Sequence, residues 1–549
     1  MPDWTKNIDP FKNWNSGGGA SGGLSGLDLT IKIGTAINKS IAGQRQRKRS
    51  EEELQREKQR QEDLLRNPPP VFGSARWATP SDLSARGALK SVSAFDHPSS
   101  LLLGTLVDEE LGNTMLGQIH WDGEGHLLTV APTRSGKSTT TIVPNLVRYK
   151  GSCVVFDPKG ELYRETADWR RENVGPVYRV APFEEQTDAF NPLETLSGPS
   201  DARTLADQII PVDPKAQDFF RKDAIAILSA LIVYVAENAP PGFRNLAEVR
   251  KITSQPLSIF RDVIEDMTRS SNPMVANAAQ IVFDKDKDRS LPSLRDTLNT
   301  EMSLWDDPGV IRATSINQLD FRALKDSPAT VYITVPFHKI KAYSGFLKIL
   351  LVTALEAMVE NPRRPDIPVL FVLDEFLSLG PFPKFRDAIQ THAGAGVRLW
   401  FFLQNLSTLE EHYPHSWKAF FDATVKMFFG TDDIFTGNLI SSILGGKTVA
   451  YRSGGSSQGG THPSGDLLGQ HASANGSVSS SVNLQGKPLL SGDEVVRLLS
   501  ATKANGTRSA ILSMGGVHPI HATLVPWFLG EKCRSRVNAQ VRPAPSPSR

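Results

Sequence analysis

The loop at residues 131–138, with the sequence APTRSGKS, constrains the fold of this 549-residue chain more than any other segment. The apolar run LLTV at residues 127–130 precedes the loop, and residues 140–149 favour a helix, so the order is strand, loop, helix. The spacing is that of G-x-x-x-x-G-K-S/T, with Ala131 in place of the first glycine. In such loops, backbone N–H groups at a helix N-terminus surround phosphate oxygens. We therefore predict a nucleotide-binding loop; a surface turn with an incidental lysine is the less favoured alternative.

Each residue type in this loop has a predicted role. We expect the ammonium group of Lys137 to reach the β- and γ-phosphate oxygens, and the hydroxyl of Ser138 to bind Mg²⁺. Gly136 allows the backbone to approach the phosphates where a Cβ atom would block it. ATP and Mg²⁺ are therefore the predicted ligands. The predicted nucleotide-binding residues are Thr133, Arg134, Ser135, Gly136, Lys137, Ser138 and Thr139.

Three polar residues after apolar runs complete the predicted site. Asp374 follows the run VLFVL and is placed to hold the water shell of Mg²⁺, while Glu375 is a candidate base that polarises the attacking water. Gln404 follows the run at 397–403 and is a candidate to orient water beside the γ-phosphate. Polar residues are common at strand ends, so these assignments depend on the loop before them. The predicted metal ligands are Ser138 and Asp374, and the predicted catalytic residues are Glu375 and Gln404.

Short apolar runs recur along the chain and predict an α/β fold with a mostly parallel sheet. They are apolar on both faces, as strands covered by helices on both sides must be. Lys137 and Asp374 must meet around one metal ion although they lie 237 positions apart (374 − 137), which predicts a domain inserted between sheet elements. The predicted strands, besides 127–130, are 152–156, 330–335, 369–373, 397–403, 425–429 and 509–513.

Composition along the chain predicts the domain boundaries. Residues 201–324 have apolar residues at helical spacing and predict an all-α insertion domain. Residues 452–485 are rich in Gly and Ser and predict a flexible loop. The full division is a flexible, Gly-rich and charged region at 1–70, the first part of the nucleotide-binding domain at 71–200, the insertion at 201–324, the second part at 325–530, and a basic disordered tail at 531–549.

Charge and cysteine content exclude some classes of protein. The 61 basic and 59 acidic residues exclude a uniformly basic binder, so DNA contact would be confined to local patches. Two cysteines are too few for a disulfide scaffold and fit a reducing compartment. The sequence has no run of about 18 apolar residues that would predict a membrane span, and residues 1–24 lack the apolar core of a secretory signal.

The order of several sequence blocks resembles one family, the TraG-like coupling-protein ATPases of type IV secretion and conjugative DNA transfer. The resemblance covers residues 71–527, and the ordered set is far more specific than any one motif. The blocks are GSARWAT (73–79), APTRSGKS (131–138), FDPKGELYRET (156–166), FNPL (190–193), VLDEFLSLG (372–380), GAGVRLWFFLQNLSTLEEHY (394–413) and KPLLSGDEVVRL (487–498).

This resemblance implies a RecA-like P-loop NTPase domain interrupted by an all-α domain, assembled as a ring, expected to be a homo-hexamer, with ATP at subunit interfaces. The implied partners are DNA bound without sequence specificity, a relaxase or secreted protein, and components of the type IV secretion channel. Lys137 and Ser138 match the family's phosphate and Mg²⁺ ligands, Asp374 and Glu375 its metal-water ligand and catalytic carboxylate, and Gln404 its sensor.

A ring motor also needs a cation from the neighbouring subunit at the γ-phosphate. Arg398 lies in a matched block and is a candidate for this trans-acting arginine, as is Arg386. An arginine on a strand is as often a structural ion-pair partner, so the alternative stays open for both. Asp157, Lys159 and Glu161 match a block next to the loop and are expected to support the site.

The sequence departs from the family at its N-terminus, because such proteins usually begin with two transmembrane helices. We expect a cytoplasmic protein or one held at the inner face of the membrane, recruited by a partner or by the weakly amphipathic region 27–41. Residues 44–66 predict a charged, solvated helix; a coiled-coil element is the alternative.

Three functions remain open from the sequence. The first is an ATP-hydrolysing motor that drives DNA, or a DNA–protein complex, into a type IV secretion channel. The second is a nucleotide-dependent adaptor that recruits relaxase or effector proteins without pumping DNA. The third is an NTPase of protein secretion that does not act on DNA.

Overall fold

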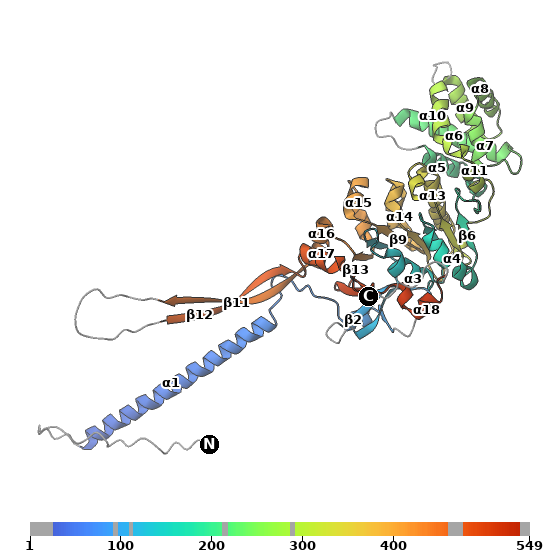
Figure 1. Ribbon diagram of the computed structural model, residues 1–549. Helices are drawn as coiled ribbons and strands as arrows, with labels where there is room; N and C mark the ends of the chain where they lie inside the picture. Colours follow the sequence, from blue (N-terminus) through green and yellow to red (C-terminus); the bar gives the residue numbers. More distant parts are fainter. Residues whose placement is uncertain are drawn as a thin grey trace. The chain divides into compact units, whose positions relative to one another are not determined.

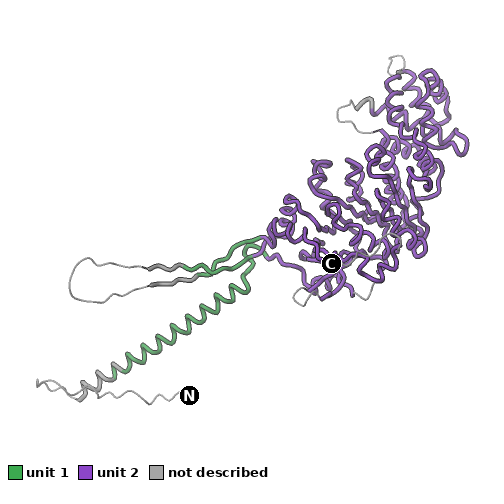
Figure 2. Tube along the Cα trace, in the orientation of Figure 1, with its two compact units in different colours: residues 1–73, 448–487 green, residues 74–447, 488–549 purple. Residues whose placement is uncertain are grey.

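The computed structural model describes residues 26–91, 97–108, 114–210, 218–285, 291–458 and 476–538. The chain divides into two compact units, one made of residues 1–73 and 448–487, the other of residues 74–447 and 488–549 (Figure 2). Every residue of the predicted site belongs to the second unit.

A twelve-stranded sheet, counted over the described residues, forms the centre of the second unit (Figure 1). Its strand order is β1-β3-β2-β14-β13-β10-β4-β9-β8-β5-β7-β6, and all pairings from β10 to β6 are parallel. The other strands pair antiparallel. The parallel strands are β10 (Val425–Phe429), β4 (Leu127–Val130), β9 (Val397–Leu403), β8 (Val369–Leu373), β5 (Cys153–Phe156), β7 (Thr330–Ile333) and β6 (Val177–Val180), and the others are β13 (Arg508–Met514), β14 (Ile520–Leu524), β2 (Leu101–Asp108), β3 (Thr114–Trp121) and β1 (Leu89–Lys90).

Two apolar cores cover the two faces of this sheet, which explains why its strands are apolar throughout. On β9, Phe401 belongs to one core and its neighbours Trp400 and Phe402 to the other. On β8, Phe371 and Val372 divide in the same way. Successive side chains of a strand point to opposite faces, so both faces must be covered by helices. The predicted α/β fold with a mostly parallel sheet is confirmed.

Helices cover both faces of the sheet. The core containing Phe401 includes residues of α13 to α17, and the core containing Trp400 includes residues of α2, α3, α4 and α18. The helices outside the insertion are α2 (Pro80–Ala85), η1 (Ser138–Ile142), α3 (Val143–Leu146), α4 (Glu161–Asn173), η2 (Pro192–Thr195), α12 (Phe337–Ile340), α13 (Ser344–Glu360), η6 (Phe376–Leu379), α14 (Pro383–Thr391), η7 (Ala393–Ala395), α15 (Leu406–His412), η8 (Trp417–Asp422), α16 (Ile434–Leu444), α17 (Gly492–Ser500), η9 (Trp527–Leu529) and α18 (Glu531–Arg534).

The described residues between β6 and β7 form helices joined by short loops, with no strand among them. On α6, Ala224, Leu228, Leu231 and Val235 are buried at helical spacing, as the sequence indicates. Figure 1 shows these helices gathered together. Their core is continuous with that of the sheet, so the division at 201 and 324 into a separate domain stays a prediction. The helices are α5 (Pro199–Ile209), α6 (Asp218–Asn238), α7 (Leu246–Ser254), α8 (Leu257–Thr268), α9 (Pro273–Lys285), α10 (Leu291–Glu301), η4 (Met302–Asp306), α11 (Pro308–Ala313) and η5 (Arg322–Lys325).

The prediction of a loop at 452–485 is wrong for its described residues. β11 (Gly446–Gln458) and β12 (Gly476–Pro488) pair as a two-stranded sheet, and residues 459–475 lie outside the described part of the chain. Small polar side chains link the strands, since Asn483 Nδ2 donates to Ser453 Oγ at 2.7 Å. Backbone pairing does not require the large apolar residues whose absence suggested a loop.

A long helix, α1 (Gly26–Arg66), spans 41 residues and belongs to the first unit. It begins before the charged run at 44–66 and includes the weakly amphipathic region, where Ile37 and Ile41 are exposed. The charged, solvated helix predicted at 44–66 is confirmed as part of α1, whereas the expectation of a flexible region is wrong for residues 26–43; residues 1–25 lie outside the described part. Among the described helices, none is both long enough and apolar enough to cross a membrane.

The predicted disordered tail at 531–549 is ordered over its first residues. Cys533 on α18 and Val537 are buried in the sheet's core, and Asn538 N donates to Glu165 O at 3.2 Å. Two apolar residues four positions apart were a burial signal within the basic sequence. Residues 539–549 lie outside the described part of the chain.

Candidate nucleotide-binding site

The carboxyl ends of four parallel strands bring the predicted site residues to one edge of the sheet. Register pairs Val130 with Leu403, and Leu373 with both Phe401 and Phe156. The residues that follow β4, β9, β8 and β5 therefore lie along the same edge: Ala131, Gln404, Asp374 and Asp157. In open α/β sheets, ligands bind outside this edge.

The loop at 131–138 joins β4 to a helical segment that begins with the π-helical turn η1. Gly136 has φ 86° and Arg134 has φ 63°, so the backbone turns through the left-handed region twice. The ammonium group of Lys137 is buried and donates to Ala131 O at 3.2 Å. The hydroxyl of Thr140 donates to Gly136 O at 2.8 Å, which fixes the loop against the first helical turn.

Gly430, directly after β10, supports the loop from the side. Its φ is 71°, and a Cβ atom there would lie 2.6 Å from Ser135 Cβ. Ser135 in turn donates through Oγ to Pro132 O at 2.6 Å. The loop can take this conformation only because the neighbouring residue is glycine.

Asp374 and Glu375 lie at the end of β8, and each is about 6% exposed. Asp374 Oδ1 is buried and has no hydrogen-bond partner among the described residues. Burial raises the pKa of Asp374 to about 6, although the nearby charge of Lys137 lowers it. Burial lowers the pKa of Lys137, and the negative charges of Asp374 and Glu375 offset only part of this effect. The structure thus brings together groups that lie far apart in the sequence.

The backbone of Glu375 is strained, with φ 51°. Among the described residues, Glu375 and Arg134 are the two non-glycine residues with positive φ, and both belong to this site. Strain of this kind costs about 1–3 kcal/mol per residue and gathers at functional sites.

Lys159, expected only to support the site, contacts Glu375 directly. Its Nζ lies 3.1 Å from Glu375 Oε1, and the lysine side chain is about half exposed. Burial lowers the pKa of Lys159, but the hydrogen bond and charge of Glu375 outweigh this and leave the pKa raised. Behind it, burial raises the pKa of Asp157 to about 7, and Asp157 Oδ2 accepts a hydrogen bond from Tyr163 N.

Gln404 lies between β9 and α15 and is partly buried. The next residue, Asn405, caps α15 through its side chain, because Asn405 Oδ1 accepts from Thr408 N at 2.9 Å. The cap fixes the backbone beside Gln404, so the Gln404 side chain extends from a fixed position at the edge of the site.

Arg398, one of the two candidate trans-acting arginines, does not fit that role. It is 1% exposed, at the opposite end of β9 from Gln404. Its guanidinium donates to three backbone carbonyl oxygens, those of Gly123, Ser99 and Asp122, at 2.5–2.7 Å. A buried and fully engaged guanidinium cannot reach a neighbouring subunit. The side chain of Arg386 on α14 is 42% exposed and pairs with Asp387 at 2.7 Å, so it remains a candidate.

The residues present fit a magnesium ion. Ser138 and Asp374 supply oxygen donors, which Mg²⁺ prefers, and the buried Oδ1 of Asp374 is an acceptor that the protein itself leaves without a partner. Such an oxygen can accept a hydrogen bond from a metal-bound water.

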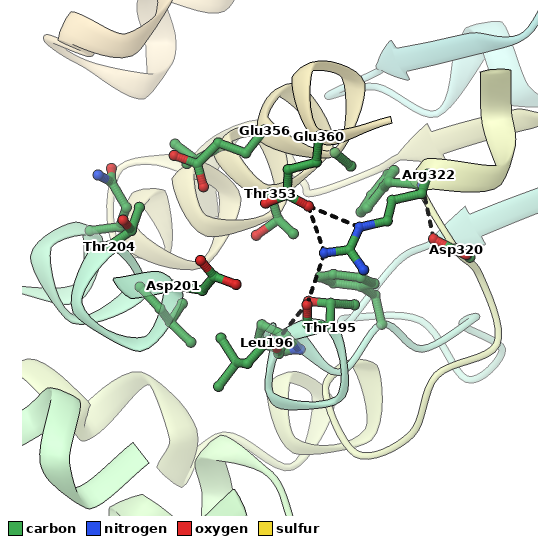
Figure 3. A pocket seen from close by; sticks show the side chains of 16 residues that line it. Thr195, Leu196, Asp201, Thr204, Asp320, Arg322, Thr353, Glu356 and Glu360 are labelled. Atoms are coloured by element: carbon green, nitrogen blue, oxygen red, sulfur yellow. Dashed lines mark hydrogen bonds and ion pairs between the residues drawn. The ribbon is translucent and has the colours of Figure 1, made fainter. Parts of the chain in front are cut away.

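A separate pocket lies where the helical segment meets α13 (Figure 3). Its one arginine, Arg322, donates to Glu360 Oε2 at 2.6 Å and to Thr195 O at 3.2 Å. The lining includes four carboxylates, which would repel phosphate, so this pocket is not the nucleotide site. Those carboxylates are Asp201, Asp320, Glu356 and Glu360.

Two residues near the loop escaped the sequence analysis. Gly430 follows the run at 425–429, and a glycine directly after a parallel strand was a usable signal of close backbone approach. Arg508 begins β13, and its Nη2 lies 3.5 Å from Arg134 O. No local pattern marks Arg508, because its position depends on how β13 pairs with β10.

Known proteins resemble this chain over most of its length. VirD4 of Rhizobium rhizogenes is 26% identical over 493 residues, which cover 87% of this chain and 68% of that protein. The conjugal transfer protein TraG of Escherichia coli is 28% identical over 482 residues, covering 79% of this chain and 72% of TraG.

Solved structures of the conjugative coupling protein TrwB share the fold. The sulphate complex of TrwBdeltaN70 has a TM-score of 0.57 at 15% identity, and the complex with the ATP analogue ADPNP has a TM-score of 0.56 at 15% identity. Each match covers 84% of this chain and 96% of the other. The family model for type IV secretory system conjugative DNA transfer matches residues 88–547. Since that match spans most of the chain, the protein belongs to the type IV secretory system conjugative DNA transfer family.

Proposed function

We propose that this protein is a P-loop ATPase that couples ATP hydrolysis to the movement of DNA, or of a DNA–protein complex, into a type IV secretion channel. The observation that supports it best is the meeting of Lys137, Asp374 and Glu375 at the carboxyl edge of the sheet. Family membership supplies the type IV context, and the relative TraG of Escherichia coli is by name a conjugal transfer protein.

In this proposal, the backbone N–H groups of residues 135–139 bind the phosphates and Lys137 neutralises their charge. Ser138 and Asp374 would hold Mg²⁺, which would stabilise the negative charge of the phosphates. Glu375 accepts a proton from the attacking water, and Lys159 fixes the carboxylate through the ion pair described above. Gln404 orients the water.

Structural relatives support ATP and Mg²⁺ as the ligands, and one candidate arginine remains for a subunit interface. The TrwB structures include complexes with ADPNP and with ADP and Mg²⁺, which supports the same ligands here. We propose a ring, with Arg386 rather than Arg398 as the residue supplied to a neighbouring subunit, because the side chain of Arg386 is partly exposed and that of Arg398 is buried.

The alternative is an adaptor that binds nucleotide to fix its assembly and recruits cargo without pumping DNA. The strained backbone at Glu375 favours the motor, since an adaptor gains nothing from a held and oriented carboxylate beside the phosphates.

The Glu375→Gln variant separates the two functions. A motor should lose about 10²- to 10⁴-fold in ATP turnover and lose DNA transfer in cells, while nucleotide binding persists. Lys503→Gln, on the loop before β13, is the matched surface control and should transfer DNA normally. Normal transfer by Glu375→Gln would establish the adaptor instead.

A second measurement separates a DNA motor from an NTPase that does not act on DNA. ATP turnover should rise when DNA is added, and the affinity for DNA should fall steeply with salt, because phosphate contacts release counterions. Turnover and oligomeric state that never respond to DNA would rule out the DNA motor.

A further inference from the structure

Arg508 lies beside the phosphate loop although nothing in the loop motif includes it. It is the first residue of β13, which is separated from β4 by β10 alone. Its Nη2 is 3.5 Å from Arg134 O, and its Nε lies 3.9 Å from where a Cβ atom on Gly136 would stand. The guanidinium therefore covers the turn of the loop that carries its left-handed glycine.

The surroundings of this guanidinium are electrostatically incomplete. Within the described residues, its one hydrogen bond is the long contact of Nη2 to Arg134 O, and no carboxylate pairs with it. Burial lowers the pKa of Arg508, and no acidic group offsets that effect. The loop adds the ammonium group of Lys137 and the positive end of a helix. Since arginine stays charged in proteins, this group of cations calls for an anion.

The sheet order shows which part of a nucleotide would meet Arg508. Asp374 and Glu375 follow β8 and Gln404 follows β9, all on one side of the loop strand β4. β10 and β13 lie on the other side. The γ-phosphate must face the carboxylates for water to attack it, so the α-phosphate and the nucleoside must extend towards β10 and β13.

The same side offers room for the remainder of the nucleotide. A cavity of about 300 Å³ lies beside the helical segment that follows the loop, and Thr140, Pro526 and Trp527 are among its lining residues. Gly506, two positions before Arg508, approaches Pro526, since a Cβ atom on Gly506 would lie 3.6 Å from Pro526 Cγ. Arg508 thus begins its strand between the phosphate loop and this cavity.

We infer that Arg508 binds the α- and β-phosphate oxygens of the nucleotide held by its own subunit. The inference rests on the proposed nucleotide binding and adds to it a ligand from the antiparallel part of the sheet. A guanidinium suits this role because it can donate two parallel hydrogen bonds to phosphate oxygens. Arg508 would thus contact the two phosphates that ADP and ATP share. The residues proposed to act at the γ-phosphate follow β8 and β9 instead.

The test measures the affinity of the full chain for ADP and for ADPNP, each with Mg²⁺, by titration calorimetry. We expect Arg508→Gln to weaken both affinities about equally, by about 10- to 100-fold, because charge-assisted hydrogen bonds are lost. Arg508→Lys should lie between this variant and the natural protein, since lysine keeps the charge but not the fork of donors. Arg497→Gln, an exposed arginine on α17, is the matched control and should bind normally.

The outcomes separate this inference from the proposed function. If the natural protein bound neither nucleotide, the proposed function would fail and the inference with it. If the natural protein bound both and Arg508→Gln bound ADP equally well, the inference alone would be overturned. Loss confined to ADPNP would also overturn it, because it would place Arg508 at the γ-phosphate. Thermal unfolding of each variant shows that it is folded, and Arg508→Lys keeps the test open if the glutamine variant is unstable.

Discussion

Buried charged side chains at the two ends of the parallel strands differ in whether their polar atoms have hydrogen-bond partners. At the amino end, Arg398 and Arg170 are almost fully buried, and each donates to several fixed acceptors. Arg170 alone donates to the carbonyl oxygens of Leu146, Tyr149 and Gly151. At the carboxyl end, Asp374 Oδ1 has no hydrogen-bond partner among the described residues.

We interpret the groups with partners as stabilising the fold and the group without a partner as available to bind a ligand. A buried polar group with all its partners stabilises the native state, whereas one without a partner costs free energy. The carboxyl end also holds both strained non-glycine residues of the described chain, Arg134 and Glu375. We therefore expect substitutions at the carboxyl end to impair turnover and those at the amino end to impair stability.

The largest effect on turnover should come from Lys137→Ala. Removing the ammonium group leaves the phosphate charge without its main neutralising side chain, so we expect ATP turnover to fall by about 10²- to 10³-fold or more. The free energy of unfolding should change little, because Lys137 makes one hydrogen bond within the protein. Steady-state turnover and urea unfolding measure the two quantities. Retained turnover would remove Lys137 from the site.

Arg398→Met should show the reverse pattern. Three buried carbonyl oxygens would lose their donor, so we expect the free energy of unfolding to fall by about 3 kcal/mol. Turnover per folded molecule should persist. Arg363→Met, an exposed arginine, is the control and should be as stable as the natural protein. A stable Arg398→Met protein without turnover would break the comparison and return Arg398 to the list of trans-acting candidates.

Much of the site was predictable because its signals are local. The loop at 131–138 and the run before Asp374 each combine a strand pattern with a polar end, and parallel strands necessarily bring such ends to one edge. Arg398 became a candidate because it shares a matched block with Gln404, although it lies near the start of the apolar run that Gln404 follows, and therefore at the opposite end of β9. The position of Arg508 depends on the pairing of β10 with β13 and β4, which no single segment encodes.

The outer segments were harder to predict for a different reason. Composition indicated a loop at 452–485, yet β11 and β12 pair through backbone hydrogen bonds and small polar side chains. The tail was assigned by charge, yet Cys533 and Val537 reach the core. In both cases the average composition of a segment concealed the few contacts that order it.

A smaller effect on turnover is expected from Lys159→Met, which keeps the aliphatic part of the side chain and removes the ion pair with Glu375. Loss of the partner lets the carboxylate move, and we expect turnover to fall by about 10- to 100-fold. The affinity for ADP should stay the same. Lys159→Arg should recover part of the rate, because arginine keeps the positive charge beside Glu375. If the side chain served only for packing, this recovery would not be expected. Equal rates for all three proteins would show that Glu375 is oriented by its backbone alone.

The smallest expected effect is on how protein stability depends on pH, through a buried carboxyl group at the carboxyl end of the parallel strands. Burial raises the pKa of Asp157 from its ordinary value of 3.8 to about 7. The folded protein therefore binds a proton here more tightly than the unfolded chain does, so this residue's contribution makes stability fall as pH rises from about 4 to about 7.

Asp157→Asn removes this titration while keeping an oxygen that can accept from Tyr163 N. Without nucleotide, the variant should be more stable than the natural protein at pH 8, by a few degrees in Tm, and this gain should shrink as pH falls towards 5. Asp168→Asn, on the exposed face of α4, should leave the pH dependence unchanged. If Asp157→Asn kept the pH dependence of the natural protein, the cost at the carboxyl end would belong to Asp374, whose pKa burial also raises.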